Sequence, residues 1–175
     1  MSDGRLTPTE IASLLLTGAA QLAAELRALP ERVVTFHPAP GEWCAKEVLG
    51  HLIEAERRGF AGRIRQVLES QNPLLQAWDA DTVARERRDC ARPLEALLAE
   101  FTSLRAESAR LVQRLRDADL ARAGRHPKVG DLSVSDIVQE WVHHDRNHIR
   151  QALANVQAFV WPAMGNARKF SALAP

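Results

Sequence analysis

Four stretches of this sequence place apolar side chains at steps of three and four residues, the spacing that gives a helix one apolar face. They cover about residues 8–29, 43–70, 93–115 and 134–158. Nowhere do apolar and polar residues alternate as in a half-buried strand, and no glycine-rich phosphate loop or internal repeat interrupts the pattern. We therefore predict an all-α protein in which four long helices form a bundle around one core.

The starts of these helices carry recognisable signals. Thr7 and Glu10 form a capping box before the first helix, Ser133 and Asp136 do so before the fourth, and Pro93 opens the third. The first helical turn leaves backbone N–H groups unpaired. A capping side chain accepts such an N–H, and proline lacks one.

The segments between the helices are less regular. The connection over residues 71–92 ends in a run of mixed charge, which we interpret as a solvated face because both signs are present. Residues 124–130 are rich in turn formers, and the tail over residues 160–175 is expected to pack on one end of the bundle.

Length and charge limit the classes of function. A chain of 175 residues is most simply one domain, 1–175, and can bury a core without disulfide or metal. A net charge of +1 gives no general field for nucleic acid, and no segment has the composition of a membrane span or a leader peptide. Two cysteines make no disulfide framework. We expect a cytoplasmic protein without nucleic-acid or membrane partners.

Histidines occupy the apolar stripe of the fourth predicted helix. His144 and His148 lie four residues apart, one above the other on one face, and His51 lies inside the second helix. Three neutral imidazoles with an open position are a ligand set of catalytic zinc and similar ions. A hydrogen-bonded core histidine is the alternative interpretation of each, because an isolated H-x-x-x-H pattern is a weak signal. If a metal is bound, acid should release it mostly below about pH 6, since the reference pKa of histidine is about 6.5.

Several other residues are candidates around such a site. Glu140 and Glu47 each lie four residues before a histidine of the cluster and could orient an imidazole or accept a proton; exposed carboxylates are the alternative. Trp78, in the long connection, is expected to form the wall of a pocket. Gln151 continues the histidine stripe and could contact a ligand, or be a buried amide bonded to a neighbouring helix.

Some polar residues are expected to be outside the site. We predict that Arg105 mostly faces solvent, that His143 lies at the surface or supports a neighbouring ligand without binding the metal, and that Cys44 is an inert helical cysteine. His37 and His126 lie beside prolines in loops, and we assign them no role.

Three motifs in order resemble the DinB-like superfamily, a group of small bacterial four-helix metalloproteins. They are Pro40-Gly41-Glu42-Trp43 leading into Lys46-Glu47-Val48-Leu49-Gly50-His51-Leu52, then Asn72-Pro73, then His144-Asp145-Arg146-Asn147-His148-Ile149-Arg150-Gln151. The resemblance covers about residues 14–170. It implies an up-down-down-up bundle, which suits the long crossover between the second and third helices, frequent homodimers, and His51, His144 and His148 as three metal ligands.

The resemblance also implies a function. Characterised members include S-transferases and isomerases that use a low-molecular-weight thiol such as bacillithiol or mycothiol. We therefore expect a divalent ion, zinc first and nickel second, that lowers the pKa of a thiol and directs it at a small electrophile in stress or detoxification. A metal-dependent hydrolase, with water in the open position, and a non-catalytic metal- or ligand-binding module are the alternatives.

Overall fold

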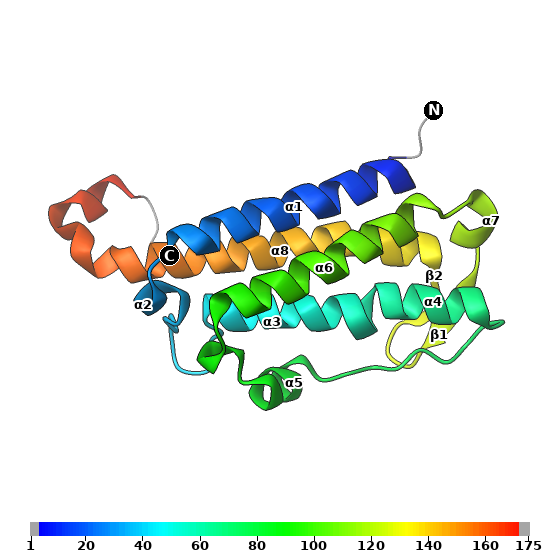
Figure 1. The fold of residues 1–175 in the computed structure, drawn as a ribbon, viewed down its shortest axis with the longest axis horizontal. Coiled ribbons are helices and arrows are strands. Elements are labelled where there is room, and N and C mark those ends of the chain that lie inside the picture. The colour runs from blue at the N-terminus through cyan, green and yellow to red at the C-terminus, as the bar shows by residue number, and fades with distance from the viewer. Residues whose placement is uncertain (1–3, 172–175) are drawn as a thin grey trace.

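The structure, a computed structural model that describes residues 4–171, is dominated by a bundle of long helices (Figure 1). The bundle consists of α1 (Pro8–Ala28), the stretch α3 (Ala45–Glu54), η1 (Ala55–Gly59) and α4 (Ala61–Glu69), then α6 (Leu94–Gln113) and α8 (Val134–Val160). The predicted all-α four-helix bundle is confirmed. Among the described residues, no helix has both the length and the apolar composition needed to cross a bilayer.

The order of directions is up-down-down-up, as expected. In Figure 1, α3 and α4 run opposite to α1, α6 runs the same way as α3 and α4, and α8 returns along α1. Both α1 and α3 pack against α6 and α8. Because α4 and α6 are parallel, the chain must return along the whole bundle between them. This crossover contains α5 (Ala80–Arg87) and the short 3₁₀ turn η2 (Asp89–Ala91).

The predicted helix starts are confirmed. The Thr7 hydroxyl accepts the N–H of Glu10, whose carboxylate accepts the N–H of Thr7 at 2.7 Å. Ser133 and Asp136 make the same pair at the start of α8, and α6 begins directly after Pro93.

The second predicted helix is not continuous. Five residues, Ala55–Gly59, form a π-helical turn, η1, between α3 and α4. A π turn adds about one residue to the local repeat and so rotates the helix that follows it. Gly62 makes this possible, because a Cβ atom at that position would overlap the carbonyl oxygen of Arg57 in η1.

Four further segments differ from the expectation. Residues 124–130 are part of a small antiparallel hairpin of β1 (Ala123–His126) and β2 (Gly130–Ser133), whose four-residue strands are too short to show alternation. Two single turns, α2 (Glu31–Val34) and α7 (Asp117–Leu120), are added to the loops. The described part of the tail, η3 (Trp161–Phe170), buries no residue, so it does not cover the end of the bundle as predicted.

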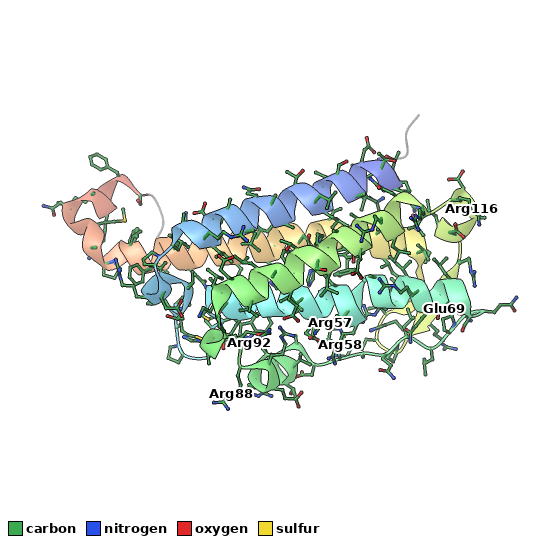
Figure 2. All side chains as sticks on the ribbon, viewed as in Figure 1. Arg57, Arg58, Glu69, Arg88, Arg92 and Arg116 are labelled. Carbon is green, nitrogen blue, oxygen red and sulfur yellow. The ribbon has the colours of Figure 1, made fainter. Side chains whose placement is uncertain are left out.

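The mixed-charge run of the crossover is not a solvated face throughout. Asp89 is 1% exposed and is bonded by both Arg87 and Arg92, and a Cβ atom at Gly50 of α3 would overlap its carboxylate. Figure 2 labels Arg57, Arg58 and Arg92 on the side of the bundle next to α5. Arg87 of the crossover pairs with Glu54 of α3, and Arg92 pairs with Glu100 of α6, so these ion pairs fasten the crossover to the bundle. Arg57 of η1 also pairs with Glu100.

Candidate metal centre

Three histidines meet between α3 and α8. One ligand nitrogen from each of His51, His144 and His148 lies within 4.8 Å of the other two, and the Nε2 atoms of His51 and His144 are 3.0 Å apart. Nitrogens that share one ion at about 2.0–2.1 Å are themselves about 3 Å apart, so the spacing fits a metal centre. The structure therefore brings together all three residues singled out in the sequence; that they bind metal stays a prediction.

The position of the cluster follows from the two helices that carry it. The core of the bundle consists of two apolar clusters, and α8 contributes Trp141 to one and Ile149 to the other. His144 and His148 lie between these two residues, where one cluster gives way to the next. His51 projects from α3 at the same level and is only 9% exposed. Phe60, the N-cap residue of α4, stacks on Trp141 with ring centroids 5.0 Å apart and meets the His144 ring edge-on at 5.0 Å.

Burial keeps these imidazoles neutral. Desolvation, reinforced by the neighbouring histidines, lowers the pKa of His51 and of His144 to about 3. The pKa of His148 is also lowered by burial, against the opposing effects of Gln151 and Asp145. Neutral imidazoles have free lone pairs at ordinary pH, which is the state that a metal ion requires.

Gln151 holds one of the three rings. Its Oε1 lies 2.8 Å from Nδ1 of His148. An amide oxygen can only accept, so Nδ1 of His148 carries the proton and Nε2 carries the lone pair. The structure thus places Gln151 as an orienting partner of a candidate ligand. By contrast, the buried Nδ1 atoms of His51 and His144 have no hydrogen-bond partner among the described residues.

The two carboxylates considered in the sequence do not orient the cluster. Glu47 accepts the N–H of Cys44 at 2.8 Å and contacts Nε2 of His37 at 2.9 Å, so it caps α3 instead of supporting His51. Glu140 is exposed and lines a cavity of about 460 Å³ together with Arg63, Trp78 and His126, among others.

Trp78 separates this cavity from the histidines. Its ring stacks on that of His51 with centroids 5.5 Å apart, and it also lines the cavity. Trp43, at the start of the second helical stretch, lies 4.9 Å from the His51 ring, and the guanidinium of Arg58 lies 5.9 Å from the ring of Trp78. The cluster thus has aromatic walls, one of them contributed by the crossover.

A buried charge cluster next to the histidines was missed, and the prediction for Arg105 is wrong. Arg105 is 1% exposed, donates hydrogen bonds to Asp145 of α8, and forms an ion pair with Glu56 of η1 at 2.7 Å. Burial raises the pKa of Glu56 to about 7, although Arg105 opposes the shift. The signal was present in the sequence, because Arg105 continues the buried α6 steps through Phe101 and Ser108.

Comparison with known proteins agrees with this arrangement. The family model of the DinB superfamily matches residues 14–152. A protein of Oceanobacillus iheyensis named "Putative metal-dependent hydrolase" is 24% identical over 109 residues, which make up 62% of each chain. One of Bacillus mycoides with the same name is 22% identical over 128 residues, 73% of each chain. The match thus spans less than two thirds of the first relative and somewhat more of the second.

A solved structure has the same fold. YfiT from Bacillus subtilis, described as a probable metal-dependent hydrolase with an unusual four-helix bundle topology, superposes with a TM-score of 0.81. The alignment covers 92% of this chain and 94% of that one at 16% sequence identity.

Proposed function

This chain belongs to the DinB superfamily, and we propose that it is a metal-dependent hydrolase whose divalent ion is held by His51, His144 and His148. One observation carries the proposal: three histidines, one buried and two half-buried, have lowered pKa values and offer ligand nitrogens within 4.8 Å of one another. The names of the relatives support hydrolysis as the reaction.

The chain's own residues set the conditions at this centre. A divalent ion held by the three imidazoles would lower the pKa of water toward 7 and would polarise a carbonyl group. Gln151 fixes the ring of His148, and the rings of Trp43, Phe60 and Trp78 limit access of bulk water around the histidines. A lower local dielectric strengthens the attraction between the ion and a developing negative charge.

The attacking group is expected to come from outside the chain. Two nucleophile candidates of the helix that carries His51 are not available to it: Cys44 is fully buried at the start of α3, and the Lys46 ammonium is bonded to Glu31 and to the carbonyls of Cys90 and Arg92. A bound water gives hydrolysis. A bound thiol would give the S-transfer expected from the sequence, for which the described residues provide no contact of their own.

A matched pair of histidine variants tests the proposal. Metal-free protein, and protein reloaded with zinc or nickel, is assayed against small esters and amides, and separately against an electrophile with a small thiol. We expect metal-dependent hydrolysis that His144→Ala abolishes. His143→Ala should leave it unchanged, because that exposed ring makes only a 3.4 Å contact with Asn147 on its own helix.

The other outcomes are equally clear. Turnover that requires the thiol would favour the transferase, and metal binding without turnover would favour the non-catalytic module. Hydrolysis that persists after chelation, or in His144→Ala, would contradict the proposal. Elemental analysis of tag-free protein identifies the ion, with zinc expected before nickel.

A further inference from the structure

A second group of soft ligand atoms lies at the end of the bundle where α3 begins. It consists of His37 from the preceding loop, Cys44 at the N-terminus of α3, and Cys90 from η2 of the crossover. One ring nitrogen and the two sulfurs lie within 4.8 Å of one another. From this juxtaposition we infer a second metal site, separate from the three histidines, for a thiophilic cation of the zinc type.

The donor set fits such an ion. Two thiolates and an imidazole are typical zinc ligands, and hard cations such as magnesium avoid them. With Zn–S bonds of about 2.3 Å, two sulfurs on one zinc lie about 3.8 Å apart. The atoms found within 4.8 Å therefore need to move by about 1 Å or less to share an ion.

Glu47 prepares the imidazole of this group. Its Oε2 lies 2.9 Å from Nε2 of His37. A carboxylate that accepts the proton of one ring nitrogen leaves the lone pair of the other for a metal, an arrangement common around zinc-bound histidines. Glu47 also accepts the N–H of Cys44, so one side chain ties together the two ligands that come from consecutive segments.

Two opposing effects act on a thiolate at Cys44: the N-terminus of α3 stabilises the negative charge, and burial destabilises it. The Glu47 backbone N–H points at it in a capping arrangement, at the positive end of the α3 dipole, which favours a thiolate. Burial acts in the opposite direction and raises the pKa of the Cys44 thiol. A bound cation would remove that cost, because it replaces the lost solvation of the thiolate.

Lys46 keeps the third ligand in place. This lysine is 2% exposed, and its ammonium donates to the carbonyl oxygens of Cys90, at 3.3 Å, and Arg92, at 2.8 Å, while it pairs with Glu31. The η2 turn is thereby attached to α3 without a covalent bond between the sulfurs. The exposed side of His37 leaves room for water as a further ligand.

Cobalt distinguishes this site from the three-histidine centre. Cobalt bound by thiolate gives a sulfur-to-metal charge-transfer absorption, which an all-histidine site cannot give. Full-length protein is reduced, freed of metal and titrated with Co²⁺ without oxygen. We expect two equivalents to bind with a charge-transfer band that zinc abolishes.

Variants assign each equivalent. His148→Ala should lose one equivalent and keep the band, whereas Cys90→Ser and His37→Ala should lose the band and keep the other equivalent. Circular dichroism checks that the variants remain helical; His37 is exposed and Cys90 half-buried, so neither change removes core volume. Absence of the charge-transfer band would contradict the second site, whereas a His148→Ala variant that loses no metal would contradict the three-histidine centre. The two failures can therefore be distinguished.

Three results would overturn the inference. One is reduced wild-type protein without a charge-transfer band, and another is a band that survives Cys90→Ser. The third is rapid formation of a Cys44–Cys90 disulfide in zinc-saturated protein, detected by thiol titration, since the pair would then act in redox chemistry instead of binding metal.

Discussion

Burial lowers the pKa of a histidine, so protons compete less well with a metal ion for its ring nitrogen. His51 and His144 have pKa values lowered to about 3 by burial, far below the ordinary value of 6.5. Protons therefore compete with a metal at these nitrogens only in strong acid. The release of metal below about pH 6, expected from unperturbed histidines, is thereby revised to a lower pH.

This shift predicts how stability depends on pH. In the unfolded chain these two histidines become protonated below about pH 6.5. In the folded state they become protonated only near pH 3. In the metal-free protein, the contribution of these two histidines to stability should therefore be fully present above about pH 6.5 and be lost progressively as the pH falls toward 3. Urea titrations at several pH values measure the slope, which should be shallower in His51→Gln. An equal slope in both proteins would show that His51 is not buried as a neutral base.

Gln151 should control affinity without being a ligand. Its hydrogen bond to Nδ1 of His148 fixes the ring and the tautomer. Loss of such a partner typically weakens metal binding by about 10–100-fold, so we expect that loss in Gln151→Ala and recovery in Gln151→Glu. Gln157→Ala, a change at an exposed position of the same helix, should leave the affinity for the metal ion, measured by titration calorimetry, unchanged. Unchanged affinity in Gln151→Ala would mean that packing alone positions His148.

At the scale of the helices, buried charge joins three elements behind the histidines. Arg105 of α6 meets Glu56 of η1 and Asp145 of α8, the residue next to His144. Such a cluster fixes the relative rotation of its helices, because every charged group must find its partner.

Removing the central cation should be costly. Arg105→Met leaves two carboxylates in the core, and loss of one partner of a buried pair costs about 3–5 kcal/mol. Arg110→Met, on the exposed side of the same helix, should change stability by less than about 0.5 kcal/mol. Chemical denaturation measures both. Glu56→Gln in the Arg105→Met background should restore part of the loss, because it removes one of the stranded charges; equal stability of the two arginine variants would contradict this account.

The π turn can be tested with two neighbouring glycines. A Cβ atom at Gly62 would overlap the Arg57 carbonyl of η1, whereas one at Gly59 would make an ordinary 3.6 Å contact with Ala55. Gly62→Ala should thus destabilise the protein by about 1–3 kcal/mol, the usual cost of overpacking, and Gly59→Ala should be neutral or stabilising. Thermal unfolding of the two variants provides the comparison, and identical melting temperatures would argue that α4 continues α3 without a π turn.

These elements also show what sequence can and cannot predict here. Apolar spacing and capping residues predicted the long helices and most of their starts, because both signals are local. The meeting of His51 with His144 could only be suggested from the residues, because spacing within one helix does not identify its neighbour; the family resemblance made it an expectation. Arg105 and η1 were missed because a buried arginine depends on carboxylates 49 and 40 residues away in the chain, and a π turn depends on packing around Gly62.

The whole molecule has several described elements that bury no residue, and η3 is the longest of them. The residues of η3 are all at least partly exposed, and Phe170 is 94% exposed. A chain ending at Val160 should keep the unfolding free energy within about 0.5 kcal/mol, as is usual for surface changes. Sedimentation of the same pair of proteins tests the predicted homodimer and whether the tail takes part in it. A large loss of stability that depends on protein concentration would assign η3 to a subunit interface.

During synthesis of the chain, the two helices that carry the candidate ligands emerge at widely separated times. His51 and His144 are separated by 93 positions, and α8 is the last long helix of the described chain to be synthesised. Contacts of such long range form late, since the loss of chain entropy on closing the loop precedes any gain. An emerging polypeptide thus has no assembled three-histidine centre to capture an ion, and loading is restricted to chains that have already completed their fold.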